Sequence, residues 1–119
     1  MADAAFTVIT PNITSVTQTI ALQAAATYNL VPIAANMMTL VVIANSDSAS
    51  HTVTFASQNG VDDNVVVTVP GSTTVITGSW SPGRWADPNN VTLANVCKVT
   101  YSVAADISMC VLWVPAASL

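Results

Sequence analysis

His51 is the only histidine in the chain, so it is the one imidazole that could act as a general base or a metal ligand. A catalytic triad would have to combine it with the neighbouring Asp47, and nothing else in the sequence supports that combination. A structural zinc site needs four ligands, and no Cys or carboxylate lies at metal-ligand spacing beside His51. We therefore expect His51 to be an exposed or capping residue at the start of a strand.

Asp62-Asp63-Asn64 contains the only adjacent pair of acidic residues. Its oxygen atoms could bind Ca²⁺ weakly, but it lacks the spaced acids of a dedicated calcium loop, so a solvated turn is predicted. The chain also has no Gly-x-Ser-x-Gly motif and no glycine-rich phosphate loop. The sequence thus predicts no catalytic residue, no metal site and no cofactor, and we expect that the protein is not an enzyme.

The segment from Trp80 to Trp85 places two tryptophans around a turn that carries Arg84, one of two basic residues. Trp and Arg are enriched at binding hot spots, which makes Trp80, Arg84 and Trp85 the candidate interface residues. In the structural alternative, Trp80 closes the end of the fold and Arg84 pairs with Asp87. Both interpretations hold if Trp80 lies inside and Arg84 or Trp85 lies outside. Because Trp80 directly follows the expected strand, we predict that its side chain is largely buried.

The length and the composition predict one domain with few charged residues on its surface. The 119 residues suit a single domain over 1–119, with residues 1–14 as a candidate extended N-terminal arm. Charged residues make up only 7% of the chain against about 25% in a typical soluble domain, and hydrophobic residues make up 52%. A net charge of −4 does little to keep copies apart. We therefore expect an oligomer, with a neutral Thr- and Ser-coated monomer as the alternative.

The charge balance also restricts partners and location. Arg84 and Lys98 alone cannot neutralise a phosphate backbone or an anionic membrane surface, so we expect no nucleic-acid and no membrane partner. No apolar run approaches the roughly 18 residues of a spanning helix. The first residues have neither a basic start nor an apolar core, so no signal peptide is predicted and a cytoplasmic origin is expected.

The pattern of β-branched residues and turn residues predicts an all-β fold, a jelly-roll-like β-sandwich of about eight short antiparallel strands. A clean alternation marks His51–Ser57, in which Val53 and Phe55 share one face. The near-continuous apolar run Thr39–Asn45 predicts a strand covered on both faces, and Pro70-Gly71 predicts a type II turn. The other expected strands are Phe6–Thr10, Ser15–Leu22, Tyr28–Val31, Val65–Val69, Thr73–Thr77, Val91–Ala94, Val96–Val103 and Ile107–Val114, with an irregular loop over Trp80–Asn90.

The last two strands are predicted to form a hairpin in which Val103 pairs with Ile107. This register leaves Lys98, Thr100, Ser102, Ser108 and Cys110 on one face. The other face is fully apolar and consists of Cys97, Val99, Tyr101, Val103, Ile107, Met109, Val111 and Trp113. It places Cys97 and Cys110 on opposite faces, so no disulfide between them is expected.

The order of these segments resembles the small jelly-roll decoration, or cement, proteins of tailed-bacteriophage capsids over roughly residues 39–114. The matching segments are Leu40–Asn45, Thr52–Phe55, Val67–Gly71, the turn Gly78-Ser79-Trp80-Ser81-Pro82 and the apolar C-terminal segment Val111–Leu119. Trp80 stands where the family usually has Phe, and Ser79 replaces its usual Pro.

The resemblance implies a non-enzymatic protein that binds the major capsid protein as a homotrimer on the virion surface, after synthesis in the host cytoplasm. One alternative is another phage structural part, such as a tail or fibre domain. A second is a carbohydrate-binding module that uses Trp80 and Trp85, which requires two coplanar exposed rings.

Overall fold

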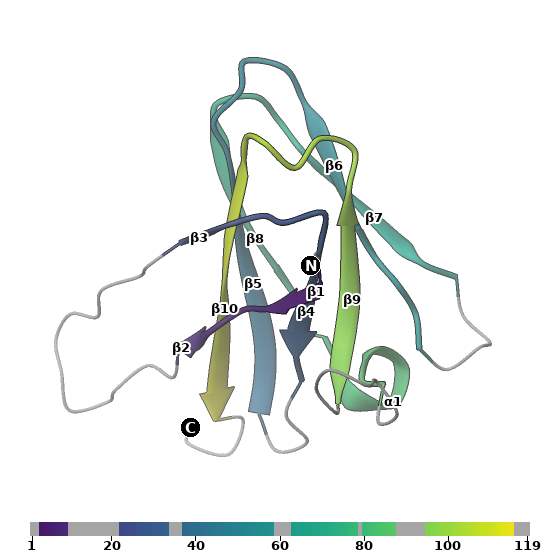
Figure 1. Cartoon of the computed structure of the whole chain (residues 1–119). Helices are drawn as coiled ribbons and strands as arrows, with labels where there is room; N and C mark the ends of the chain where they lie inside the picture. Colours follow the sequence, from purple (N-terminus) through teal and green to yellow (C-terminus); the bar gives the residue numbers. More distant parts are fainter. Residues whose placement is uncertain are drawn as a thin grey trace, which may run out of the picture.

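The computed structural model describes residues 3–9, 22–33, 37–58, 63–78, 80–87 and 95–115, which form two packed β-sheets (Figure 1). This all-β sandwich confirms the predicted fold class. The first sheet contains, in spatial order, β1 (Asp3–Ala5), β4 (Tyr28–Pro32), β9 (Val96–Tyr101), β6 (His51–Phe55) and β7 (Val65–Val69). The second contains β2 (Val8–Ile9), β10 (Ile107–Pro115), β5 (Met37–Asn45) and β8 (Thr73–Gly78), and β3 (Gln23–Ala24) also pairs with β10.

The predicted N-terminal strand is two short strands, one in each sheet. β1 pairs with β4 and β2 pairs with β10, both in parallel, whereas the other ladders among the described residues are antiparallel. Between them, Phe6 is buried and its amide donates a hydrogen bond to the Leu30 carbonyl. Residues 3–9 of the candidate N-terminal arm therefore have an extended backbone and pair with strands of both sheets.

Most of the remaining expected strands lie where the pattern placed them. In β6, Val53 and Phe55 are buried and Thr52 and Thr54 are half-buried, which confirms the predicted alternation. The prediction of an irregular loop after Trp80 was wrong at Pro82–Trp85, which form the one-turn helix α1. The expected strand at residues 91–94 and most of the one at residues 15–22 lie outside the described residues.

The predicted hairpin of the last two strands was wrong. β9 lies between β4 and β6 in the first sheet, whereas β10 pairs with β5 along nine residues of the second sheet. The chain from Ser102 to Asp106 crosses from one sheet to the other instead of closing a tight hairpin (Figure 1). The inward faces were nevertheless predicted correctly for Cys97, Val99, Met109 and Val111, which meet across the sandwich interior.

The core lies between the sheets and explains the separation of the two cysteines. Cys97 belongs to the buried cluster between the sheets, whereas Cys110 is buried on the opposite side of β10. Both thiols are free, which confirms the prediction that they are not bonded to each other. The reason is that they lie in different sheets, not on two faces of one hairpin.

Three connections meet at one end of the molecule, which we call the tip: loop 46–50, turn 70–72 and loop 102–106 (Figure 1). The buried Asn45 side chain organises it, because its amide nitrogen donates to the carbonyls of Ala49 and Val69 and its oxygen accepts from the Asp47 amide. The predicted type II turn was wrong: positive φ occurs at Ser72 (54°) and not at Gly71.

Candidate functional site

The predicted interface segment packs into the interior near the end of the molecule opposite the tip (Figure 1). Trp80 is only 6% exposed, and its ring stacks on Phe55 with centroids 3.9 Å apart. Its indole nitrogen donates to the Thr77 hydroxyl at 3.2 Å, which satisfies the one polar atom of the ring. The prediction that Trp80 is largely buried is therefore confirmed.

Trp85 is the residue of this segment for which the sequence-based prediction and the structure differ. The interpretation of Trp85 as an exposed contact residue was wrong, because its side chain is only 5% exposed. Its ring meets the Trp80 ring edge-on, with the centroids 4.8 Å apart and the planes at 90°. The turn of helix α1 is the cause: with its amide bonded to the Ser81 carbonyl, Trp85 is directed back toward Trp80. Two perpendicular, buried rings do not provide the coplanar exposed platform that sugar stacking requires.

Arg84 is the one of the three candidate interface residues that keeps appreciable exposure, being half-buried. Its guanidinium lies 4.5 Å from the centre of the Trp85 ring, a cation–π contact, and donates to the Asp63 carbonyl at 2.7 Å. The backbone carbonyl of Arg84 also accepts from the Gln58 amide at 2.7 Å. These contacts attach α1 to the chain around residues 58 and 63, so Arg84 has a structural role there.

A larger apolar surface lies on the side of the second sheet that faces away from the core. Val41 and Ile43 of β5 face inward, so the alternate residues of β5 and their registered partners on β8 and β10 face outward. These outward residues are Met38, Leu40, Val42 and Ala44 of β5, Thr74, Ile76 and Gly78 of β8, and Ser108, Cys110, Leu112 and Val114 of β10. None of them is charged.

Exposure is uneven over this outer face. Ile76 and Met38 are 61% and 37% exposed, Leu40, Val42 and Leu112 are half-buried, and Cys110 is buried. The expectation that β5 is covered on both faces therefore holds for its inner face, while its outer face is only partly covered within the chain. Sequence reasoning missed this surface, although the apolar runs over residues 37–45 and 107–115 carried the signal.

The outer face of the first sheet has a different chemistry. Its β6 and β9 strands present Thr52, Thr54, Lys98 and Thr100, and the Lys98 ammonium lies 4.0 Å from the centre of the Tyr28 ring. Threonine hydroxyls can hydrogen-bond water, which an aliphatic surface cannot do. The first sheet also exposes Val66 of β7, which is 57% exposed beside Thr54. Its outer face therefore mixes hydroxyls, one ammonium and one aliphatic side chain, whereas the outer face of the second sheet is uncharged and mainly aliphatic.

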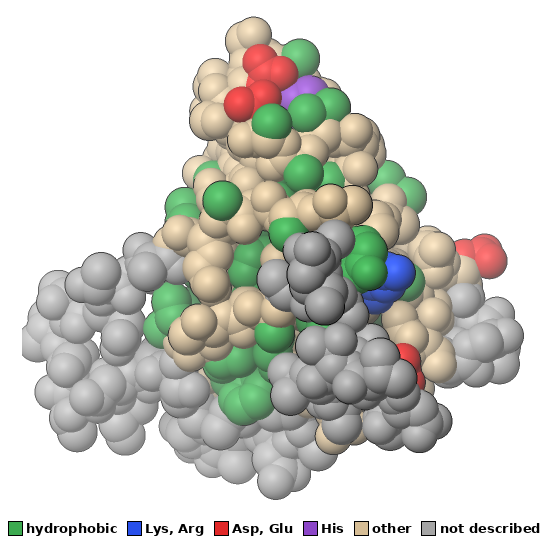
Figure 2. All heavy atoms as spheres, viewed as in Figure 1, with side chains coloured by type: hydrophobic (Ala, Val, Ile, Leu, Met, Phe, Trp, Pro, Cys, Tyr) green, Lys and Arg blue, Asp and Glu red, His purple; other side chains and the backbone are tan. Residues whose placement is uncertain are grey.

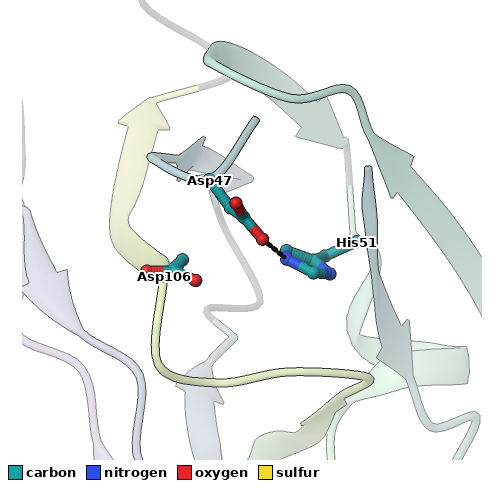
Figure 3. Close-up of side chains that lie close together, drawn as sticks. All are labelled: Asp47, His51 and Asp106. Atoms are coloured by element: carbon teal, nitrogen blue, oxygen red, sulfur yellow. Dashed lines mark hydrogen bonds and ion pairs between the residues drawn. The ribbon is translucent and has the colours of Figure 1, made fainter. Parts of the chain in front are cut away.

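The tip gathers the only histidine with two carboxylates. His51 Nε2 lies 2.8 Å from Asp47 Oδ2, and a ligand atom of Asp106 completes a group whose members all lie within 4.8 Å of one another (Figure 3). The hydrogen bond from His51 and that from the Ser48 amide lower the pKa of Asp47. The sequence offers no carboxylate at metal-ligand spacing beside His51, but the fold brings Asp106 to it from a distant part of the chain, next to Asp47. The expectation of an exposed His51 was wrong, because its side chain is only 11% exposed.

The predicted acidic turn shows only structural contacts in its described part. Asp63 and Asn64 are exposed, and the Asn64 side chain accepts a hydrogen bond from the Ser57 amide at 3.0 Å. Asp62 lies outside the described residues. Across the described residues, no helix is long and apolar enough to cross a membrane. Comparison with protein-family models, with curated proteins and with solved structures gives no match to this chain.

Proposed function

We propose that this protein is an oligomeric decoration, or cement, protein that attaches to the outer surface of a tailed-bacteriophage head and stabilises the major capsid lattice. The observation that carries the proposal is the outer face of the second sheet. An aliphatic sheet face with an Ile that is 61% exposed is a poor surface to leave in water and a good one to bury against another protein.

The charges of the chain favour association in the same way. The outer face of the second sheet contains no Asp, Lys or Arg among its described residues, so no charge has to be desolvated when a partner covers it. Both basic side chains already have intramolecular contacts, Arg84 with Trp85 and Lys98 with Tyr28. The partner that suits this chain is therefore another folded protein with an apolar surface of its own, either a further copy or the major capsid protein.

The family resemblance adds the identity of that partner. The segments that resemble capsid decoration proteins lie in strands β5, β6, β7 and β10 and in the turn from the end of β8 into α1. These strands form both sheets and the outer apolar face, so the resemblance and the candidate contact surface involve the same part of the chain. A trimer on the capsid exterior, made of subunits with uncharged faces, accounts for both.

The proposal is tested by mass and by attachment. Light scattering at micromolar concentration should give about 37 kDa, three times the 12.3 kDa chain, and the protein should cosediment saturably with undecorated capsid shells. A 12.3 kDa species that also fails to cosediment would overturn the proposal. Many copies over the shell of isolated virions would support decoration, whereas a few copies at one vertex would identify a tail or fibre component instead.

A further inference from the structure

The tip holds a group of side chains that the decoration role does not use. Asp47 lies in the loop after β5, His51 begins β6, and Asp106 directly precedes β10 (Figure 3). The group therefore spans both sheets. Figure 2 shows acidic side chains gathered around the histidine at this end of the molecule.

The backbone around these residues is held in place before any ligand arrives. The buried Asn45 side chain fixes loop 46–50 through its hydrogen bonds with the backbone of Asp47, Ala49 and Val69. The amide and the hydroxyl of Ser46 both donate to the Asp106 carbonyl, which ties loop 46–50 to loop 102–106. His51 has only 11% of its side chain exposed and Asp47 has 36%, so an ion between them would be partly shielded from water.

The charges at the tip are not balanced by the described residues. Asp47 and Asp106 bring two carboxylates together, and His51 is the only group there that can carry a positive charge. Within the described part of the chain, no Lys or Arg pairs with either carboxylate, and no group donates a hydrogen bond to the Asp106 carboxylate. A cation placed between the three side chains would supply the missing positive charge.

We propose that Asp47, His51 and Asp106 form a binding site for a divalent transition-metal ion of the Zn²⁺ class, with water completing the coordination. An imidazole with two carboxylates suits Zn²⁺ or Co²⁺, whereas Ca²⁺ and Mg²⁺ prefer oxygen ligands alone. In a tetrahedral site, ligands bound at about 2.0–2.2 Å lie about 3.3–3.6 Å from one another, so the most distant atoms of the 4.8 Å group have to approach each other by up to about 1.5 Å. The metal takes the place of a proton on one ring nitrogen of His51: a neutral imidazole keeps its single proton on the other nitrogen, and a protonated imidazole releases one proton to water.

Such an ion would link the two sheets at the tip. It would join loop 46–50 and the start of β6 to the beginning of β10, and its binding should therefore raise the melting temperature of the folded protein. This consequence is independent of capsid attachment, so the metal site and the proposed function can fail separately.

The test is Zn²⁺ and Co²⁺ binding to the full chain after chelator treatment. Calorimetry should give one Zn²⁺ per chain and a rise in melting temperature of several degrees at saturating metal, with no response to Mg²⁺. Co²⁺ should produce visible absorption bands typical of nitrogen and oxygen ligands. One metal per chain with no loss of binding in the variants below would overturn the assignment, as would no binding at tens of micromolar metal.

The informative variants are Asp106→Asn and His51→Gln, with Asp63→Asn as the matched control. Asn has nearly the same shape as Asp, and no described group donates a hydrogen bond to the Asp106 carboxylate. The metal-free Asp106→Asn variant should therefore melt like wild type. Each of the two tip variants should weaken Zn²⁺ binding by about tenfold or more, and the exposed Asp63→Asn should not change it. Equal loss in Asp63→Asn would indicate nonspecific binding to surface carboxylates and would also overturn the site.

Discussion

At the scale of single residues, the aromatic and sulfur-containing side chains have structural roles. Trp80 joins the end of β8 to Phe55 of β6, and hence one sheet to the other. Trp113 makes a second connection, because its indole nitrogen donates to the Pro32 carbonyl of β4 at 3.0 Å. Both contacts stabilise the packing between the sheets rather than a surface for ligands.

Replacing Trp80 with Ala should destabilise the domain strongly. Removal of a buried Trp side chain typically costs about 3–5 kcal/mol, since it leaves a cavity and removes the stacking on Phe55. At several degrees per kcal/mol, the melting temperature should fall by more than about 10 °C. Calorimetry should compare the melting temperatures of Trp80→Ala and Trp80→Phe. The Phe variant keeps a ring against Phe55, so its melting temperature should fall much less. Unchanged melting of Trp80→Ala would contradict the burial of this side chain.

Cys97 should be inert in the folded protein. Burial raises the pKa of its thiol to about 12, and the thiol donates to the Ala56 carbonyl at 3.3 Å, so almost no thiolate exists at pH 8. Burial also raises the pKa of Cys110. Alkylation with iodoacetamide should therefore be slow in buffer and fast in denaturant, where both thiols should titrate without reductant. An intramolecular bridge found by mass spectrometry would contradict the placement of the two cysteines in different sheets.

At the scale of elements, the turn between β7 and β8 depends on close packing against loop 46–50. The Ser72 amide donates to the Asp47 carbonyl at 2.7 Å, and Asn45 contacts the carbonyls of Val69 and Pro70 from the other side. Gly71 lies so close to the Ser48 carbonyl that a β-carbon has no room there. The glycine is required at this turn by the approach of another backbone.

Gly71→Ala should therefore cost stability, by about 1–3 kcal/mol, because the turn or loop 46–50 has to shift. Gly83→Ala is the matched control: a β-carbon at Gly83 meets nothing within 4 Å, and Ala is the better helix former in α1. Urea denaturation of the two variants should show a clear loss for the first and no loss for the second. Similar midpoints for both would show that the tip is not packed in this way.

At the scale of the whole molecule, the two outer faces and the tip divide the surface. Threonines and Lys98 cover part of one face, and aliphatic residues cover much of the other. Acidic groups gather at the tip (Figure 2). Among the described residues, the outer face of the second sheet offers the larger uncharged area for a protein partner, although Val66 is also exposed on the first sheet. The tip, with its charged side chains, is suited to a cation instead.

Placing a charge on the aliphatic face should prevent association. Ile76→Lys adds an ammonium at a side chain that is already 61% exposed, so the subunit should fold normally but pay the cost of burying a charge at any interface. Its mass by light scattering should drop to that of the 12.3 kDa chain, with a melting temperature close to that of the isolated wild-type subunit. Thr100→Lys, exposed on the opposite sheet, should leave the mass unchanged. The reverse pattern would place the interface on the first sheet.

The sequence by itself determined the strands and which of their residues face inward. Alternation in β6, and in the inward residues of β9 and β10, is a local property, because side chains of a strand point to opposite sides whatever lies next to it. Turn residues likewise marked where β7 and β8 are separated. The burial of Trp80 could be predicted for a related reason, since a large apolar ring directly after a strand has the interior within reach.

Only the tertiary structure decided which strands are neighbours and which distant groups meet. The alternation of β9 and β10 satisfies a hairpin and a sandwich equally well, because either arrangement buries the same faces. In the sandwich, β10 pairs with β5 in the second sheet while β9 lies in the first, so Cys97 and Cys110 belong to different sheets. The same arrangement brings Asp106 close to His51 at the tip. Their spacing along the chain does not predict this contact, because the approach of residues far apart in the sequence depends on the whole fold.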